Sequence, residues 1–273
     1  MSDQAAKASR FLALHRGETP LLMPNAWDAG SARLLVSLGF GALATTSSGH
    51  AATLGRLDGS VSRGEALEHA ATIVAATDVP VSADLEHGFA DAPEGVAETI
   101  RGALAAGLAG CSVEDYGREQ DAIYELELAT ARVAAAAEAA HTGPVHLVLT
   151  ARAENYLHGR PDLDDTIARL DAYQEAGADV LYAPGLADPD DIRRVVESVQ
   201  LPVNVLARPG APSVAELGAL GVARISVGGA FAFNALGALV EAATELREQG
   251  TYGYTQRSAT GLRAVRQAFA ENP

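Results

Sequence analysis

One pattern of apolar and polar positions recurs along the chain: a helical segment ends at a glycine, and a short, uniformly apolar run follows it. The pattern appears at residues 34–45, 104–114, 173–182 and 217–227. A glycine suits the left-handed backbone with which many helices end. An apolar run without alternation indicates a strand that is buried on both faces, as in a parallel sheet.

Four further strands are predicted where proline opens or bounds an apolar run, because proline is tolerated at the first position of a strand. They cover residues 20–24, 79–84, 144–150 and 201–206. Eight strands separated by helical segments predict an α/β fold, the (β/α)8 TIM barrel. We expect one domain over residues 1–273, with a helical extension from about residue 229 to residue 273.

A doubly wound open sheet is the main alternative to a barrel. That fold would carry a glycine-rich phosphate-binding turn after its first strand. The sequence at that point, Asn25-Ala26-Trp27-Asp28, contains no glycine, and the barrel is therefore favoured.

The composition of the chain limits which partners it is expected to bind and in which compartment it is expected to occur. The 273 residues include 20 Lys and Arg against 35 Asp and Glu, a net charge of −15. An acidic chain without a basic block disfavours nucleic acids and anionic membranes, because both require clustered cations. A single cysteine, Cys111, excludes an intrachain disulfide and a cysteine-based zinc site and is typical of a reducing compartment. Since no run of about 18 apolar residues occurs and no apolar segment follows the N-terminal charges, we expect a cytoplasmic protein.

Carboxylates gather at the ends of neighbouring predicted strands, where a barrel carries its chemistry. The third strand ends at Asp84 with Glu86 two residues later, the fourth ends at Glu114, and Asp58 lies in the loop after the second. Like charges this close are costly unless they share a cation or a proton. Oxygen ligands without thiolates select Mg²⁺, or Mn²⁺, over Zn²⁺. We expect Asp84 to contact the metal directly and the other three through water; the alternative is that these acids cap the following helices.

Other residues at the same end of the barrel suit a small carboxylate substrate. Arg152, at the end of the fifth strand, can grip a carboxylate with two parallel hydrogen bonds, or else form an ion pair with Glu154 or Glu114. The turn at residues 47–49 offers hydroxyl and N–H donors for an oxyanion. The expected substrate-binding set is Ser47, Ser48, Gly49, Arg152 and Asn204 of the seventh strand.

Six ordered motifs resemble the isocitrate lyase/phosphoenolpyruvate mutase superfamily. They lie at residues 24–33, 44–49, 54–59, 83–89, 113–115 and 151–152, and the resemblance extends from about residue 21 to residue 239. It implies a (β/α)8 barrel whose last helix is exchanged between subunits, Mg²⁺ as cofactor, and a 2-oxo acid or its enolate as substrate. The apolar stretch 231–240 agrees with such an exchange, and we expect a homodimer or homotetramer.

The resemblance also implies roles for the candidate residues. Asp84 corresponds to the direct metal ligand, while Ser47 and Ser48 would hold a carboxylate or carbonyl of the substrate. The outer metal ligands would be Glu86, Glu114 and Asp58. The residues that we expect to take part in catalysis are Arg152, Glu114 and Asp58.

The sequence departs from the superfamily in the loop after the fourth strand. Lyases of this group carry a proton-transferring cysteine there, and phosphonomutases carry a lysine with an asparagine or threonine. Residues 115–124 contain none of these side chains and no histidine. Tyr116, Arg118 and His87 remain as candidate acids or bases, and the sequence does not decide among them.

We expect a magnesium-dependent carbon–carbon lyase or decarboxylase, similar to 2-methylisocitrate lyase or oxaloacetate decarboxylase. Its substrate would be a small 2-oxo or 2-hydroxy di- or tricarboxylic acid that reacts through an enolate. Decarboxylation needs an electron sink but no acid from the loop, because water can reprotonate the enolate. Two alternatives remain: carbon–phosphorus bond chemistry on a phosphonopyruvate-like acid, as in a phosphonomutase or hydrolase, or a barrel that binds a dicarboxylate without turnover.

Overall fold

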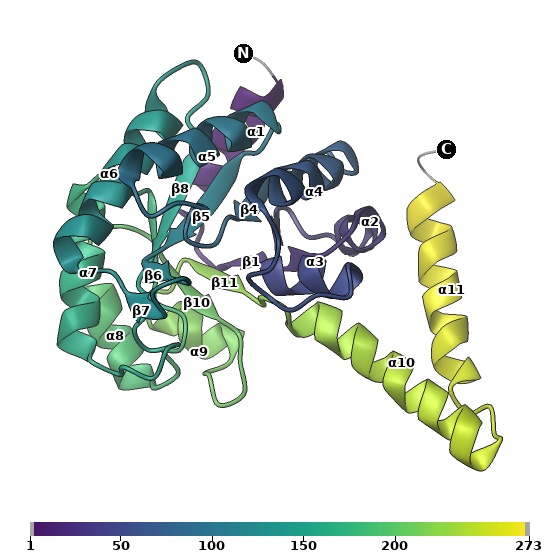
Figure 1. Cartoon of the computed structure of the whole chain (residues 1–273). Helices are drawn as coiled ribbons and strands as arrows, with labels where there is room; N and C mark the ends of the chain where they lie inside the picture. The colour runs from purple at the N-terminus through teal and green to yellow at the C-terminus, as the bar shows by residue number, and fades with distance from the viewer. Residues whose placement is uncertain (1–2, 271–273) are drawn as a thin grey trace.

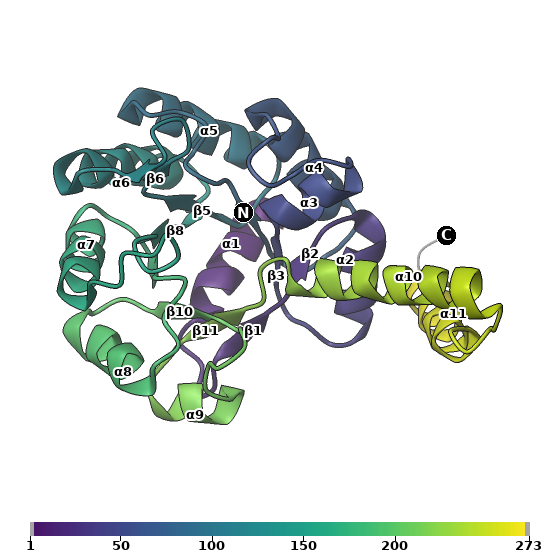
Figure 2. The same cartoon turned by 60° about the horizontal axis from the view of Figure 1, so that its bottom comes forward.

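A closed ring of parallel strands forms the centre of the computed structural model, which describes residues 3–270 (Figures 1 and 2). The strand segments pair in the order β1–β11–β10–β9–β8–β5–β4–β3–β2. Only Pro24 separates β1 (Leu21–Met23) from β2 (Asn25–Ala26), so these segments are two halves of one strand that closes the ring. Proline has no N–H to donate to the ladder, which explains the interruption. The predicted (β/α)8 barrel is therefore confirmed.

Each remaining barrel strand lies within a segment predicted from the sequence, except β8, which extends two residues beyond its predicted end. These strands are β3 (Leu43–Thr45), β4 (Val81–Asp84), β5 (Gly110–Glu114), β8 (Val148–Arg152), β9 (Val180–Tyr182), β10 (Val203–Leu206) and β11 (Arg224–Ser226). A short antiparallel hairpin of β6 (Tyr116–Gly117) and β7 (Ala122–Ile123) follows β5. The glycines of the recurring pattern, Gly39, Gly107, Gly177 and Gly221, have φ between 84° and 100°, as a left-handed helix end requires.

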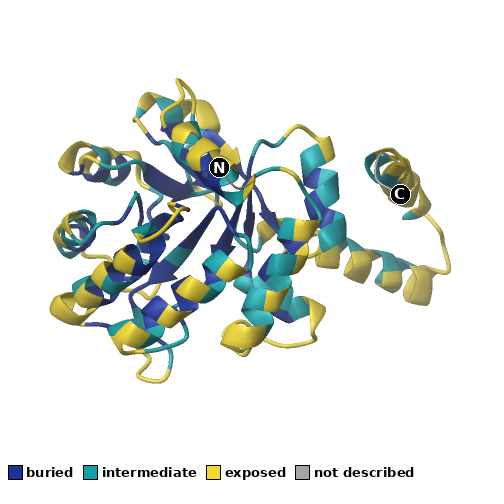
Figure 3. Cartoon of the chain, turned by 90° about the horizontal axis from the view of Figure 1, so that it is seen from above, coloured by how far each residue is buried: buried dark blue, intermediate teal, exposed yellow. Residues whose placement is uncertain are grey.

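Helices surround the ring and follow the strands in turn. They are α2 (Ala29–Ser37), α3 (Ser47–Thr53), α4 (Arg63–Ala75), α5 (Pro93–Ala105), α6 (Leu126–His141), α7 (Leu163–Glu175), α8 (Pro189–Ser198) and α9 (Val214–Ala219). Figure 3 shows buried strands at the centre and helices whose outer faces are exposed. No helix of residues 3–270 combines the length and apolar character that crossing a membrane requires.

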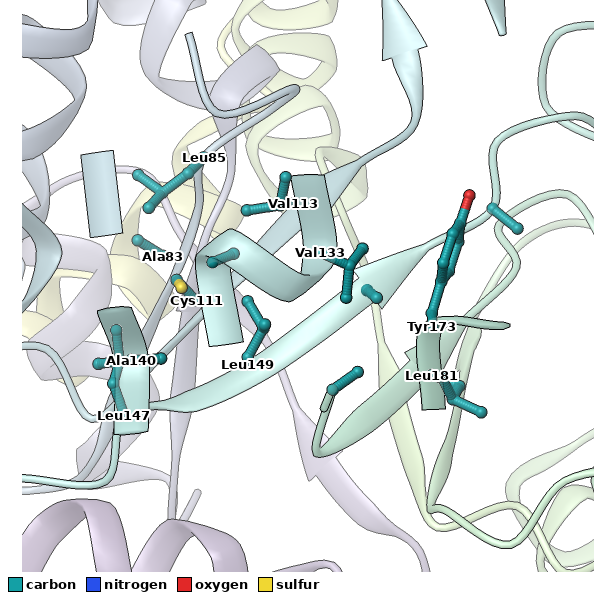
Figure 4. Packing of buried hydrophobic residues seen from close by; sticks show 14 of the residues in the cluster. Ala83, Leu85, Cys111, Val113, Val133, Ala140, Leu147, Leu149, Tyr173 and Leu181 are labelled. Atoms are coloured by element: carbon teal, nitrogen blue, oxygen red, sulfur yellow. The ribbon is translucent and has the colours of Figure 1, made fainter. Parts of the chain in front are cut away.

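The main core lies between the strands and the helices (Figure 4). Cys111 and Val113 of β5 point outward into this core and are buried. The alternate residues of the same strand, Ser112 and Glu114, therefore face the barrel axis, since side chains alternate along a strand. Burial in apolar surroundings raises the pKa of the Cys111 thiol, and this cysteine packs as a small hydrophobic residue.

Helix α1 (Asp3–Leu14) closes the amino-terminal end of the barrel. Phe11 of α1 is fully buried against Gly110, where an added Cβ would lie 2.6 Å from the phenyl ring. His15, just after the helix, is bound on both nitrogens: Nδ1 lies 2.9 Å from the carbonyl of Phe11, and Nε2 lies 3.2 Å from Nη1 of Arg224. The base of the barrel is thus packed shut.

The last two helices leave the barrel as an arm. Helix α10 (Ala230–Gln249) projects outward, and α11 (Thr255–Ala270) turns back to pack against α2 (Figure 1). Of the residues in this arm, only Ala232 is buried. Leu22, on the outward face of β1, is 41% exposed. The exchange of the last helix between subunits stays a prediction, and these exposed apolar surfaces are the reason to test it.

We predict that the arm packs against a second copy of the chain and gives a dimer or tetramer. Leu239 and Val240 of α10 are exposed and apolar, and covering such a surface is favourable at roughly 25 cal/mol per Å². Light scattering at micromolar concentration should show the oligomer. Substitutions Leu239→Glu and Val240→Glu should shift it toward the monomer, whereas Leu128→Glu on α6 should not. A monomeric natural chain would contradict the prediction.

A second prediction concerns stability at low pH. Burial and the charge of Arg224 lower the pKa of His15 from 6.5 to about 3. Below pH 6.5 the His15 imidazole therefore binds a proton in the unfolded chain but stays neutral in the folded chain. The folded state loses stability as the pH falls. Relative to a His15→Gln variant, the free energy of unfolding should fall by about 2 kcal/mol between pH 7.5 and pH 5. Urea titrations at both pH values measure this, and parallel curves would contradict it.

Candidate active site

A cavity of about 180 Å³ runs from the carboxyl-terminal mouth of the barrel toward its middle. The mouth carries Asp58, Asp84 and Arg152, together with the first residues of α3. Ser47, Ser48, Asp58, Asp84, Arg152 and Asn204, six of the predicted site residues, line this one cavity. The structure therefore brings these six residues together in a cavity at the carboxyl-terminal ends of the strands, and their roles stay predictions.

Arg152 is the centre of an ion-pair cluster at the mouth. Its Nε lies 2.7 Å from Glu154 Oε1, and its Nη1 lies 2.9 Å from Asp84 Oδ1. Its Nη2 lies 3.1 Å from Glu114 Oε2, consistent with the register that pairs Glu114 with Arg152 across β5 and β8. The two ion pairs considered as alternatives for Arg152 are thus both present, and Asp84 adds a third. Burial opposes its charge, but the three carboxylates outweigh it and raise the pKa of Arg152.

Asp84, the last residue of β4, is oriented by a side-chain hydroxyl and by a backbone N–H. Its N–H donates to Thr45 Oγ1 at 2.9 Å, and its Oδ2 accepts from the N–H of Ser47 at 3.3 Å. Residues 47–49 form the first turn of α3, capped by Thr46, whose Oγ1 accepts from the N–H of Gly49 at 3.3 Å. The N–H groups of Ser47 and Gly49 therefore already have acceptors, and Ser48 contributes its hydroxyl to the cavity wall.

The acids beside Arg152 are buried together. Burial raises the pKa of Glu86 to about 7, against the opposing charge of Arg118. Burial also raises the pKa of Glu114 and of Glu154, although Arg152 opposes both shifts. Each of these three carboxylates is buried, so each loses hydration that a neighbouring cation would replace.

The charges at the mouth do not balance. Five carboxylates, those of Asp58, Asp84, Glu86, Glu114 and Glu154, face two guanidinium groups, those of Arg118 and Arg152. With all groups ionised the formal charge is −3, and a divalent cation would reduce it. The candidate donors are carboxylate oxygens, and no thiolate is among them; the imidazole of His158 lies 3.9 Å from Glu154 Oε2, on the far side of the ion pairs of Arg152 from Asp84. Carboxylate oxygens are the ligand chemistry that suits Mg²⁺ or Mn²⁺. The residues present therefore fit such a metal ion.

Arg118 brings a guanidinium to the cluster from the loop between β6 and β7. Its Nε lies 2.7 Å from Glu86 Oε2, and its Nη2 lies 3.7 Å from Asp58 Oδ2. An added Cβ on Gly59 would lie 2.0 Å from Nη1 of this arginine, so a larger residue there would displace the guanidinium from its present position. Of the three acid–base candidates in the sequence, Arg118 is the one with ion pairs to the carboxylate cluster.

The other two candidates lie apart from the cluster. The hydroxyl of Tyr116 donates to Asp121, and its ring stacks on His158 with centroids 3.5 Å apart. The backbone carbonyl of His87 accepts from Arg132, whereas Nδ1 of its imidazole is buried and has no hydrogen-bond partner among the described residues. Burial lowers the pKa of this imidazole. Neither side chain forms an ion pair with the cluster among the described residues.

A buried network behind the mouth fixes the cluster. Asp115 Oδ1 accepts from the N–H of Glu154 at 2.8 Å, which ties the end of β5 to the end of β8. Its Oδ2 accepts from Arg169 Nη1 at 3.2 Å and from the hydroxyl of Tyr173 at 2.5 Å, both on α7. Removing one partner from such a buried pair typically costs about 3–5 kcal/mol of stability.

The structure places Asn204 below the mouth, in the middle of the barrel. Its Nδ2 donates to Ser226 Oγ at 3.0 Å, and its Oδ1 accepts from Arg224 Nε at 2.9 Å. Sequence reasoning did not single out Arg224. The available signal was a charged residue inside an otherwise apolar strand, at residues 222–227.

A comparison with known proteins places the chain among enzymes of related chemistry. The profile of the phosphoenolpyruvate phosphomutase family matches residues 11–247. An uncharacterized protein of Mycobacterium tuberculosis is 35% identical, covering 80% of this chain and 81% of that one. The 2-methylisocitrate lyase of Halalkalibacterium halodurans is 30% identical, covering 74% and 67%, and oxaloacetate decarboxylase 2 of Pseudomonas fluorescens is 29% identical, covering 89% and 84%.

Solved structures agree over most of the chain. A Burkholderia cenocepacia protein provisionally assigned as a lyase or mutase is 54% identical, with a TM-score of 0.91 over 94% of this chain and 93% of that one. A second protein of the same organism, provisionally assigned as a phosphonomutase, is 40% identical with a TM-score of 0.84, covering 91% and 100%.

Proposed function

The chain belongs to the isocitrate lyase/phosphoenolpyruvate mutase superfamily, and from this membership we propose that it is a magnesium-dependent carbon–carbon lyase or decarboxylase. Its substrate would be a small 2-oxo or 2-hydroxy di- or tricarboxylic acid. The observation that carries the proposal is the excess of carboxylates around Arg152 at the barrel mouth. Relatives named 2-methylisocitrate lyase and oxaloacetate decarboxylase support this class of reaction.

Asp84 would hold Mg²⁺ directly, and Glu86, Glu114 and Asp58 would hold it through water. Asp84 is suited to direct contact because it lines the cavity, whereas Glu86 and Glu114 are buried behind it. Mn²⁺ suits the same oxygen ligands. When bound, the metal supplies positive charge that stabilises an enolate oxygen.

The chain's own residues would bind and orient the substrate. Arg152 would bind the carboxylate next to the reacting carbon, with the guanidinium N–H groups that its three acids leave free. The hydroxyl of Ser48 would donate to the carbonyl oxygen on which negative charge develops. In decarboxylation the carbon–carbon bond breaks, CO₂ leaves, the electron pair forms the enolate, and water supplies the proton.

The loop cation Arg118 cannot serve as the proton donor, because a guanidinium keeps its protons at any ordinary pH. Its ion pairs with Glu86 and Asp58 make it a positioning residue for the acids. Decarboxylation is therefore compatible with this loop, because the reaction needs no proton-donating side chain from it. Cleavage of a 2-hydroxy acid requires a base for the hydroxyl, and Glu86, with a pKa of about 7, is a suitable carboxylate.

Carbon–phosphorus bond chemistry is the second candidate, favoured by the 40% identical relative provisionally assigned as a phosphonomutase. An assay with Mg²⁺ and a panel of oxaloacetate, 2-methylisocitrate, citramalate and phosphonopyruvate tests both. Decarboxylation of oxaloacetate, cleavage of 2-methylisocitrate or citramalate, and hydrolysis of phosphonopyruvate would each give pyruvate, with CO₂, succinate, acetate or phosphate as the second product. A phosphonomutase would instead convert phosphonopyruvate to phosphoenolpyruvate without a second product, so both compounds are measured. Tight binding of these acids without turnover would instead favour a dicarboxylate-binding barrel.

For the metal site we predict that Asp84→Ala abolishes Mg²⁺ binding and activity, while Glu86→Ala weakens both less. A direct ligand cannot be replaced by water without loss of its charge, whereas water can take over part of an outer ligand's role. Calorimetric titration of Mg²⁺ into each variant measures the difference. Equal affinity in the natural chain and in Asp84→Ala would refute the assignment.

For the substrate site we predict that Arg152→Lys lowers kcat/KM by about 10²-fold, or ~2.7 kcal/mol of transition-state stabilisation. Lysine keeps the charge but loses the planar fork. The melting temperature should fall as well, because Arg152 joins three acids, so the kinetics are measured well below it. Arg193→Lys, in an exposed ion pair with Asp190, is the control. Unchanged kinetics with a lower melting temperature would assign Arg152 to the scaffold.

A further inference from the structure

The middle of the barrel holds a buried cation with no acidic partner. Arg224 is 2% exposed. Its Nε donates to Asn204 Oδ1 at 2.9 Å, its Nη2 to Thr150 Oγ1 at 3.0 Å, and its Nη1 contacts His15 Nε2 at 3.2 Å. None of the ion pairs among residues 3–270 includes this guanidinium. A guanidinium has five N–H donors, so neutral acceptors occupy only part of it.

The surroundings of Arg224 do not compensate its charge. His15 is neutral, because burial and Arg224 lower its pKa to about 3. Its Nδ1 bonds to the carbonyl of Phe11, which leaves Nε2 as the acceptor for Arg224. Burial in turn lowers the pKa of Arg224 to about 9. Arg152, the other arginine that lines this cavity, is paired with carboxylates. The buried Arg132 on α6 also has no carboxylate partner among the described residues, but it donates to three backbone carbonyls and does not line the cavity.

Arg224 is accessible from the active site, since it lines the same cavity as Asp84 and Arg152. Small hydroxyl side chains, Ser82, Ser112 and Ser226, line the same cavity. Ser112 is paired with Thr150, which accepts from Arg224, so it lies beside this cation in the register of the strands. Large branched apolar residues usually fill this layer of a TIM barrel. The small polar lining leaves room beside the cation and supplies further hydrogen-bond donors.

The position of this cation relative to the mouth follows from the strands. Thr150, which accepts from Arg224, precedes Arg152 by two residues on β8, a rise of ~7 Å. The two guanidinium groups therefore belong to consecutive inward layers of the barrel. A molecule with a negative charge at each end can contact both.

We propose that Arg224, with the serine hydroxyls around it, forms an anion subsite at the floor of the cavity. The ligand is a small anion with acceptor oxygens or a halide charge. It comes either from the far carboxylate of the substrate or from a free inorganic anion. The assignment of a substrate carboxylate to this subsite rests on the proposed function, whereas the existence of the subsite does not.

A substrate carboxylate held by Arg224 is one that stays in the product. A carboxylate that leaves as CO₂ gives up its negative charge to the enolate. A cation that binds this carboxylate stabilises the substrate more than the transition state and would therefore slow the loss of CO₂. The subsite therefore selects acids with a retained far carboxylate over acids whose only second carboxylate is lost. This deepens the proposed function toward cleavage of a longer di- or tricarboxylate.

The first arm of the test compares two 2-oxo acids that differ only at the far end. Calorimetry with Mg²⁺ in chloride-free buffer should show 2-oxoglutarate binding at least 10-fold tighter than 2-oxobutyrate. Arg224→Gln should remove this preference and leave the affinity for 2-oxobutyrate unchanged, while Arg193→Gln on the surface should keep both. A preference that persists in Arg224→Gln would overturn assignment of the far carboxylate to this subsite.

The second arm tests the subsite without any substrate. Chloride should raise the melting temperature of the natural chain but not that of Asn204→Asp, which places a carboxylate where Asn204 Oδ1 now lies 2.9 Å from Arg224. Asn204→Asp should melt higher than the natural chain when no chloride is present, because it supplies the missing counter-charge. Equal chloride responses, together with an unchanged preference in the first arm, would overturn the subsite.

The two proposals fail separately. If neither 2-oxo acid binds but chloride protects the natural chain through Arg224, the subsite takes a free anion and its assignment to a substrate carboxylate is wrong. The proposed function is wrong if, in addition, no acid of the assay panel is turned over. If both acids bind in an Arg152-dependent way and substitution of Arg224 changes nothing, the proposed function stands and the subsite is wrong.

Discussion

The concentration of like charge at the mouth of the barrel is the constraint on which the site depends. Strands β4, β5 and β8 bring Asp84, Glu114 and Glu154 to one place, and Arg152 holds all three. Burying carboxylates is unfavourable unless cations and hydrogen bonds replace the lost hydration. One guanidinium cannot balance three acids, so a shared proton or a further cation would lower the cost of the arrangement. Burial is the main cause that raises the pKa values of Glu114 and Glu154, and the neighbouring acids shift them in the same direction against Arg152.

The alternation of side chains along each strand divides the barrel interior into layers of different chemistry. On three neighbouring strands the inward residues form the pairs Ser82 and Asp84, Ser112 and Glu114, and Thr150 and Arg152. The outer member of each pair is charged, and the inner member is a small hydroxyl residue. Every second residue of a strand faces the barrel axis. This alternation places the charged residues in a layer at the mouth and the small hydroxyl residues in the layer beneath it.

Much of this architecture is local in origin and could be predicted from the sequence. Helix-ending glycines such as Gly107 and buried apolar runs such as that of β5 depend on neighbouring residues, and so the eight strands were found. Strand ends carry the acids, and so Asp84 and Glu114 were placed correctly. Asn204 was expected at the mouth but lies one layer lower, because β10 continues to Leu206. Its hydrogen bond to Arg224 joins two strands, and the sequence of neither strand alone indicates such a contact.

The loop after β5 shows why residue types alone did not predict the remaining part of the site. Compared with lyases of the superfamily, the loop has lost its expected proton carriers, and that loss alone suggested an empty position. The structure instead places Arg118 against Glu86 and Asp58, with Gly59 leaving the space for it. A fixed positive charge in that position lowers the cost of gathering the acids but holds its proton. On the proposed function, acid–base work would then fall to water or to a carboxylate, and burial raises the pKa of the nearby Glu86 to about 7.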